Sequence, residues 1–148
     1  MQVSDTSILI ASLYEAHPHH SESIKYIHQL QRRDGKAGVI SHTLAELYSV
    51  LTRAPLQPEI RPLSARDLIQ QNILTLFSVI DVTRQDYLTA IDLCVAHNGR
   101  GGVIHDALIL VAAIRHRANQ LVTWNVKHFE RLADGKIEIV APPESRIS

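Results

Sequence analysis

The chain lacks the features that mark disulfide-bonded and membrane-spanning proteins. Its single cysteine, Cys94, excludes an internal disulfide bond, and its place in a helical pattern favours a packing role in a reducing compartment. The longest uninterrupted apolar run, residues 107–114, is too short to cross a bilayer, and no basic region followed by an apolar stretch opens the sequence. We therefore expect a cytoplasmic protein with no membrane segment.

A net charge of either sign is also missing. The 15 Lys and Arg residues cancel the 15 Asp and Glu residues, so any nucleic-acid site must be a local basic rim rather than a generally positive surface. With 45% hydrophobic and 20% charged residues in 148, the composition is that of an ordinary globular domain. This length can bury a core without disulfides or structural metals, and we expect one domain over residues 1–148.

Short apolar or β-branched runs alternate with longer helical patterns along the chain. The runs cover residues 2–4, 38–40, 78–82, 121–123 and 138–140. This alternation is typical of βαβ units. It predicts an α/β sandwich with a central parallel sheet of about five strands between layers of helices.

The helical patterns cover residues 8–16, 21–33, 64–76 and 83–95, with an amphipathic helix over 44–51 and a short amphipathic turn over 126–132. Gly35 ends the second pattern, and Thr83 and Asp86 have capping-box spacing. Residues 107–114 are apolar on every face and predict a central, buried helix beginning at Asp106.

Three prolines, Pro55, Pro58 and Pro62, predict a loop within the domain. We hypothesise that this loop and its flanking helices form an interface.

Four oxygen-bearing side chains stand at predicted helix starts, and three of them closely follow a strand. They are Asp5, Glu46, Asp106 and Asn125. In open α/β sheets the carboxyl ends of parallel strands meet at one edge, so these side chains can converge although the sequence separates them. Carboxylate oxygens are the ligands that Mg²⁺ prefers.

Each of these residues also has a structural explanation. Asp5 can cap the helix that follows it, and Thr43 and Glu46 match a capping box in which Glu46 bonds back to the Thr43 amide. Asp106 can serve as a partner of the helix dipole, although a carboxylate entering an apolar helix costs several kcal/mol unless a cation or donors meet it. Asn125 can be an ordinary cap or turn residue.

The histidines are open to the same two interpretations. His105, beside Asp106, could touch a substrate or be a satisfied structural histidine. His17, His19 and His20 suggest zinc, but Pro18 and the lack of a partner Cys or His pair favour a solvated turn.

Taken together, four segments resemble, in order and spacing, the signatures of PIN domains, most closely those of the VapC-type toxins. They are Val-Ser-Asp-Thr-Ser-Ile-Leu-Ile at residues 3–10, Thr-Leu-Ala-Glu-Leu at 43–47, Ile-His-Asp-Ala-Leu-Ile at 104–109 and Val-Thr-Trp-Asn-Val-Lys-His-Phe at 122–129. The resemblance spans nearly the whole chain. It departs from the commonest pattern in its short first strand and in Asn125 at the last acidic position, which favours one metal over two.

This resemblance implies an Mg²⁺- or Mn²⁺-dependent endoribonuclease, usually dimeric, that a small antitoxin protein holds inactive. Asp5 and Asp106 would be the primary metal ligands, with Glu46 as a ligand or water-orienting base. By the same resemblance, Thr6, Thr123 and Asn125 would orient water or phosphate, and the products would carry a 5′-phosphate and a 3′-hydroxyl. Arg53, Arg100, Lys127 and His128 flank the motifs and could form a basic rim for the RNA backbone, or be solvated surface charges.

Two other classes of protein compete with this interpretation. An aspartyl-phosphate phosphatase also places Asp after its first strand, but it needs a second Asp two residues later, where this chain has Ser7. A non-catalytic RNA- or protein-binding PIN module is suggested by Asn125 alone. The presence of Asp5, Glu46 and Asp106 argues against it.

Overall fold

The computed structural model describes residues 1–32, 37–53 and 58–143, and a parallel sheet of five strands runs through them. The order across the sheet is β3-β2-β1-β4-β5, and every neighbouring pair is parallel. The strand formed by the first residues of the chain is therefore the central one. The strands are β1 (Gln2–Ser4), β2 (Ala37–Ile40), β3 (Ser78–Ile80), β4 (Gln120–Val122) and β5 (Glu138–Val140).

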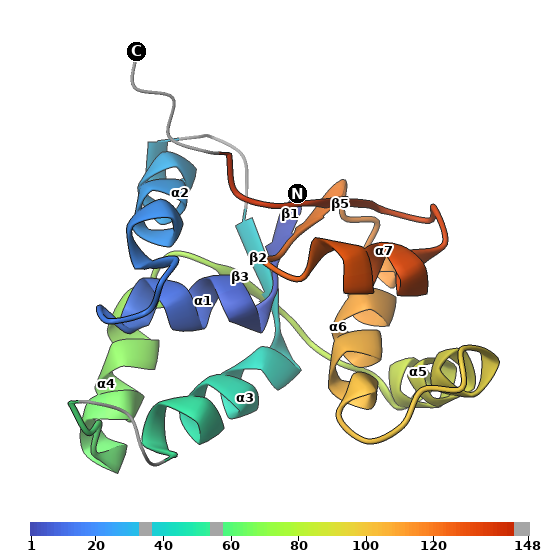
Figure 1. Ribbon diagram of the computed structural model, residues 1–148, viewed down its shortest axis with the longest axis horizontal. Coiled ribbons are helices and arrows are strands. Elements are labelled where there is room, and N and C mark those ends of the chain that lie inside the picture. Colours follow the sequence, from blue (N-terminus) through green and yellow to red (C-terminus); the bar gives the residue numbers. More distant parts are fainter. Residues whose placement is uncertain (33–36, 54–57, 144–148) are drawn as a thin grey trace.

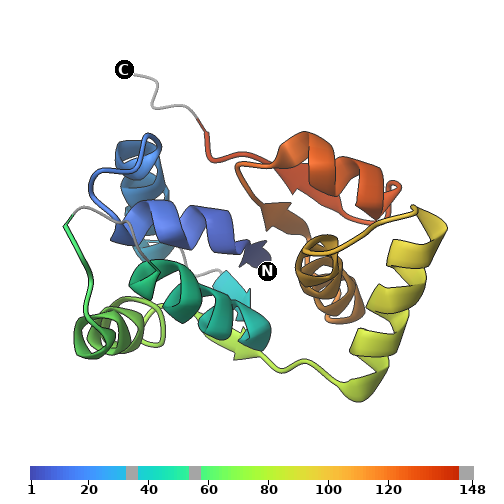
Figure 2. The same ribbon diagram turned by 60° about the horizontal axis from the view of Figure 1, so that its bottom comes forward.

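Helices cover both faces of the sheet. Figures 1 and 2 show α1, α2, α3 and α4 on one side and α5, α6 and α7 on the other. This arrangement confirms the predicted α/β sandwich. The helices are α1 (Thr6–Leu13), α2 (His20–Arg32), α3 (Ser41–Thr52), α4 (Pro62–Asn72), α5 (Arg84–Ala96), α6 (Val103–Arg115) and α7 (Val126–Ala133).

Alternate residues of the strands serve the two faces of the sheet. Val39 and Val122 belong to the apolar cluster formed with α1, α2, α3 and α4. Their strand neighbours Ile40 and Leu121, together with Val3, belong to the cluster formed with α6 and α7. Because side chains alternate between the two faces of a strand, β2 and β4 each contribute to both cores.

Helix α6 is buried as its sequence predicts. Leu108, Ile109 and Leu110 are at most 1% exposed. Cys94 on α5 is also buried and packs in a small cluster with Ala107 and Leu108, which confirms its packing role.

Several element boundaries differ from those expected. Helix α1 covers residues 6–13 rather than 8–16, and β3 ends at Ile80 rather than at residue 82. Helix α6 begins at Val103, so Asp106 lies within its first turn rather than at its start. Pro62 opens α4 instead of belonging to the loop, because the first helical position needs no backbone N–H donor. The predictions made for Gly35 and Pro55 lie outside the described residues.

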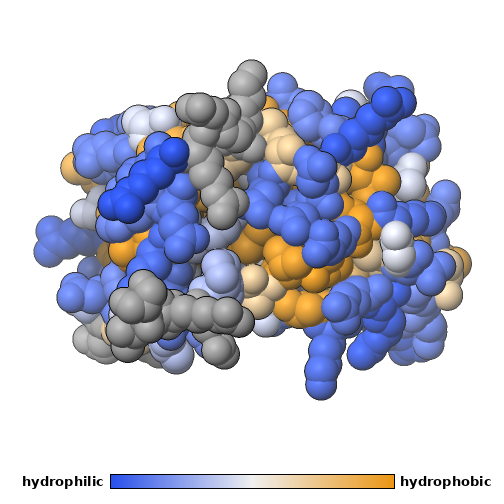
Figure 3. All heavy atoms as spheres, turned by 90° about the horizontal axis from the view of Figure 1, so that it is seen from above, coloured by the Kyte–Doolittle hydropathy of each residue, from blue (hydrophilic) through white to orange (hydrophobic). Residues whose placement is uncertain are grey.

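The surface shows no sign of a membrane segment within the described ranges. No helix there is both long enough and apolar enough to cross a bilayer. The face shown in Figure 3 is mostly hydrophilic, and its largest apolar area lies right of centre.

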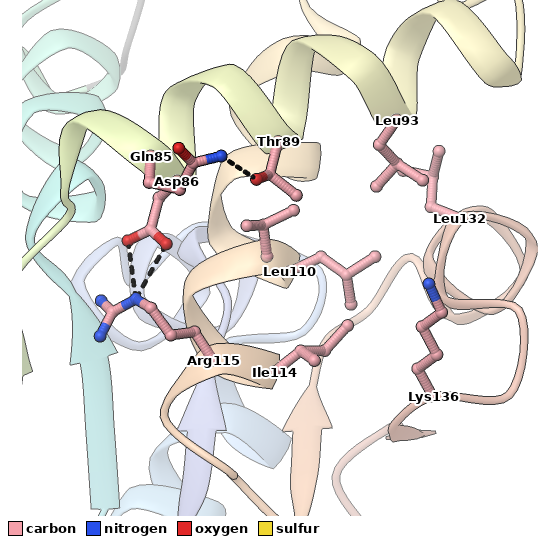
Figure 4. A pocket seen from close by; sticks show the side chains of 10 residues that line it. Gln85, Asp86, Thr89, Leu93, Leu110, Ile114, Arg115, Leu132 and Lys136 are labelled. Atoms are coloured by element: carbon pink, nitrogen blue, oxygen red, sulfur yellow. Dashed lines mark hydrogen bonds and ion pairs between the residues drawn. The ribbon is translucent and has the colours of Figure 1, made fainter.

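A groove of about 340 Å³ lies between α5, α6 and α7. Apolar side chains, among them Leu93, Leu110 and Ile114, form its walls (Figure 4). The ion pair between Asp86 and Arg115 lies at one end of the groove and Lys136 at the other. None of the four residues predicted to carry chemistry lines this groove.

Candidate active site

Helices begin at the carboxyl ends of the central strands, and there the predicted site residues gather. Helix α1 follows β1 after Asp5, α3 follows β2 directly, and α7 follows β4 after a short turn (Figure 1). Helix α3 packs against both α1 and α6. Asp5, Glu46 and Asp106, which are far apart in sequence, are therefore brought to one edge of the sheet.

Asp5 is both the N-cap of α1 and the most buried carboxylate of the site. It is 2% exposed, and its Oδ2 accepts hydrogen bonds from Thr123 Oγ1 at 2.9 Å and from the Ser7 backbone N–H at 3.4 Å. Asp5 therefore caps α1, as one interpretation predicted. Capping is not its main contact, because the shorter hydrogen bond comes from Thr123 at the end of another strand. The bond from Thr123 ties β4 to β1 exactly where the two strands end.

Glu46 faces the same site from the second turn of α3. Its Oε1 accepts a hydrogen bond from Thr6 Oγ1 at 3.2 Å, and Thr43 Oγ1 lies 3.3 Å from the same hydroxyl. The capping-box alternative is wrong, because α3 begins at Ser41 with Ile40 as its N-cap, so Thr43 lies inside the helix. The amphipathic pattern predicted over residues 44–51 is confirmed only in part on α3. Leu47 and Leu51 are buried, whereas Tyr48 is 43% exposed.

Asp106 is less buried than an apolar helix predicts, with 30% of its side chain exposed. Its Oδ2 lies 2.9 Å from Nε2 of His128 on α7. His128 was a candidate for the basic rim, and the structure places it against a site carboxylate instead.

The other predicted residues lie around this group. Thr6 and Thr123 are buried and bonded to the carboxylates. Asn125 is the exposed N-cap of α7, and its side chain makes no capping bond. Arg100 and Lys127 are exposed and have no hydrogen bond or ion pair within the described part of the chain.

The three carboxylates resist ionisation. Burial is the main cause that raises the pKa of Asp5, Glu46 and Asp106 above their ordinary values. Repulsion between the negative charges raises these pKa values further. Asp106 raises the pKa of Asp5, and Asp5 and Asp106 together raise the pKa of Glu46. No Lys or Arg among the described residues forms a salt bridge with any of the three.

This donor set fits a hard divalent cation. Each carboxylate uses one oxygen for the bonds described above, and its second oxygen accepts no hydrogen bond from the described residues. A cation at this edge would offset the mutual repulsion of the carboxylates and bind oxygen ligands of the preferred type. In the described ranges, no three Asp, Glu, His or Cys side chains already stand in metal-binding geometry. A cation held by all three carboxylates would therefore require these side chains to move.

A hollow of about 370 Å³ adjoins Glu46. Arg53, His42 and His105 line it, and His42 Nε2 lies 2.8 Å from His105 Nδ1. Burial and the neighbouring His105 lower the pKa of His42. Of the four residues predicted for a basic rim, Arg53 alone lines this hollow.

Two residues of this group were not predicted from the sequence. Ser7 Oγ lies 3.3 Å from Thr123 Oγ1 and accepts a bond from the Trp124 backbone N–H at 3.1 Å, so it joins α1 to the turn after β4. His42 in the first turn of α3 pairs with His105. The only sequence signal that could have identified them was their position: Ser7 lies two residues after Asp5, and His42 lies two residues after the end of β2.

Comparisons with known proteins agree with this geometry. A family model described as the PIN domain matches residues 3–135. Ribonuclease VapC27 of Mycobacterium tuberculosis is 30% identical over 115 residues, which cover 77% of each chain. Ribonuclease VapC40 of the same species is 26% identical over 148 residues, which cover 94% of this chain and 97% of the relative.

Solved structures with the same fold include several toxins. The crystal structure of M. tuberculosis VapC20, a toxin that cleaves the sarcin–ricin loop, matches with a TM-score of 0.71 at 17% identity, covering 93% of this chain and 98% of that one. The DNA-bound VapBC structure from Salmonella typhimurium matches with a TM-score of 0.69 at 19% identity, covering 96% and 98%.

Proposed function

This chain belongs to the PIN-domain family, and we propose that it is a metal-dependent endoribonuclease, the toxin of a toxin–antitoxin pair. The observation that carries the proposal is the meeting of Asp5, Glu46 and Asp106, each with one carboxylate oxygen left without a donor among the described residues. The similarity to the VapC ribonucleases supports RNA as the substrate.

Asp5, Glu46 and Asp106 would hold Mg²⁺ or Mn²⁺. When bound, such an ion lowers the pKa of a bound water and offsets charge on the leaving oxygen. Thr123 and Thr6 orient Asp5 and Glu46 through their hydroxyl groups. Asn125 replaces a fourth acidic side chain with a neutral amide, which favours a single metal ion.

The RNA backbone would lie along the basic side of the site. Arg53 reaches the hollow beside Glu46, while Arg100 and Lys127 are exposed and free to contact phosphates. His128 was also predicted for this rim, but its Nε2 lies against Asp106. Cleavage would leave a 5′-phosphate and a 3′-hydroxyl.

A small antitoxin is the expected protein partner, as in the VapBC complexes that share this fold. We place the homodimer at the proline loop and its flanking helices. Residues 54–57 of that loop lie outside the described residues. Tyr48 on α3, Leu63 on α4 and Leu74 just after α4 are each at least 43% exposed and line a hollow of about 540 Å³. A monomer measured by light scattering at micromolar concentration would contradict this placement.

The first test is cleavage of a panel of structured and single-stranded RNAs by the purified protein with Mg²⁺, Mn²⁺ or EDTA. We expect metal-dependent cutting that is lost in Asp5→Ala, with Asp67→Ala as a control for an exposed carboxylate. RNA binding with no cleavage under any metal would instead support a non-catalytic binding module. A covalent phosphate trapped on Asp5 would support a phosphatase.

A further inference from the structure

Two stacked aromatic rings lie beside the carboxylates and have no role in the chemistry proposed above. Trp124 follows Thr123, and its ring stacks on that of His19, with the ring centroids 4.1 Å apart and the planes at 11°. The indole packs against the apolar cluster of α1, α2, α3 and α4 and donates from Nε1 to Ser23 Oγ at 3.0 Å. His19 is exposed, so its ring forms the outer layer of the stack.

The turn before α2 fixes this outer ring in place. His20 Nδ1 lies 2.8 Å from the Ala11 carbonyl oxygen, and the His19 backbone N–H donates to His17 Nδ1 at 3.0 Å. The His17 ring lies beside His19, with centroids 5.9 Å apart and planes tilted by 38°, so it is not parallel to the stack. The histidine-rich segment is therefore an anchored turn that presents one ring to solvent, rather than merely a solvated turn.

Ser7 makes hydrogen bonds both to the stack and to the carboxylate group. The Trp124 backbone N–H donates to Ser7 Oγ, and the Ser7 backbone N–H donates to Asp5 Oδ2. One short chain of hydrogen bonds thus fixes the position of the indole relative to the most buried carboxylate.

We infer that the outer face of the His19–Trp124 stack binds one unpaired base of the RNA while the backbone of that strand passes the carboxylates. This inference rests on the proposed function. Aromatic side chains bind bases of single strands and loops through their π-faces, whereas a base within a duplex is already stacked on its neighbours. The stack therefore selects RNA that is single-stranded or looped at the position next to the cut.

The chain offers a reporter of binding to this stack, because its only tryptophan, Trp124, lies directly under His19. The purified protein in EDTA is titrated with a short unstructured oligoribonucleotide and, separately, with the same strand in a blunt duplex. Binding is measured in parallel from the anisotropy of a label on the RNA. We expect the single strand to quench Trp124 emission to saturation and the duplex to leave it unchanged.

Variants at His19 separate stacking from general binding. His19→Ala should weaken binding of the single strand by about tenfold or more, the usual effect of removing an aromatic ring from under a base. His19→Phe, which keeps a flat ring, should restore the affinity. His28→Ala removes an exposed histidine of the helix that follows, α2, and should bind as the unaltered chain does.

Three results would overturn the inference: RNA binding by anisotropy with unchanged Trp124 emission, a His19→Ala variant that binds normally, or no binding of any unpaired RNA. The cleavage assay distinguishes this failure from that of the proposed function. Metal-dependent cutting with unchanged Trp124 emission rejects the base platform alone. Quenching by the single strand with no cutting under any metal rejects the ribonuclease and leaves the platform as an RNA-binding site.

Discussion

Buried carboxylates with raised pKa values make the protein less stable at neutral pH. Between the ordinary value, 3.8 for Asp106, and its raised value in the folded state, the folded chain holds more protons than the unfolded one. The free energy of unfolding therefore falls as the pH rises through this range, and the loss is complete above it. The same sign applies to Asp5 and Glu46.

Asp106→Asn should separate chemistry from stability. The substitution removes a charge that burial penalises, so we expect a Tm at neutral pH without divalent ions that is unchanged or raised by up to about 4 °C, with cleavage lost. Thermal unfolding at pH 7 and near pH 4 checks this, because the gain should shrink at the lower pH. Asp67→Asn, an exposed carboxylate, serves as the control. Unfolding of Asp106→Asn would instead assign a structural role to its bond with His128.

At the scale of single residues, the sequence was enough to find the carboxylates but not their partners. Their positions near helix starts made Asp5, Glu46 and Asp106 candidates, the resemblance to PIN domains assigned them metal-binding roles, and those roles stay a prediction. The bonds from Thr6 to Glu46 and from Thr123 to Asp5 join residues 40 and 118 positions apart, and no local pattern encodes them. The same is true of the pair formed by His42 and His105, 63 positions apart.

At the scale of elements, capping signals were predictable where they depend on nearby residues only. Thr83 and Asp86 form the predicted capping box of α5, with bonds of 2.9 Å and 3.1 Å. The Thr43 and Glu46 pair has the same spacing but lies inside α3, because the helix extends back to Ser41. Spacing alone cannot reveal where packing extends a helix.

Asp86 also connects α5 to α6, and its removal should destabilise the fold. Arg115 Nε donates to both Asp86 oxygens, at 2.8 Å and 3.1 Å. Burial by itself would raise the pKa of Asp86, but the bonds from Arg115 and Thr83 outweigh it and lower the pKa. The stabilisation is therefore present above the ordinary value of 3.8 and is lost as the pH falls through the lower folded value.

Asp86→Asn should cost about 1–3 kcal/mol at neutral pH, the range for losing a cap and a charged hydrogen bond. Urea unfolding at pH 7 and at pH 3 measures the cost, which should shrink at the acidic end. Asp92→Asn, on the exposed side of the same helix, should have little effect. Equal stability of the Asp86 and Asp92 variants at pH 7 would show that the connection to α6 contributes nothing.

At the scale of the whole molecule, the alternation of elements predicted the layers but not the order of the strands. Short apolar runs indicate strands without saying which are neighbours, so the order β3-β2-β1-β4-β5 appears only in the structure. That order places β1 between β2 and β4. It thereby brings Asp5, the start of α3 and Thr123 to one place.

Because the site is shared among distant elements, a metal ion bound there should stabilise the whole fold. At a concentration about 100 times its Kd, Mn²⁺ or Mg²⁺ would add about 2.7 kcal/mol, which corresponds to a rise in Tm of about 5–11 °C. Thermal unfolding over a series of metal concentrations measures this, with NaCl of equal ionic strength as the control. Asp5→Asn should abolish the rise, and an equal rise in that variant would place the ion elsewhere.

The central position of β1 also has a consequence for synthesis on the ribosome. The hydroxyl that orients Asp5 belongs to Thr123, which is made 118 positions later. At about 5–20 residues per second, about 6–24 s pass between the two. A nascent or truncated chain ending before residue 123 thus has the first carboxylate without its orienting hydroxyl and without β4 beside β1. A cell making this protein is therefore exposed to a formed site only after residue 123 has been translated.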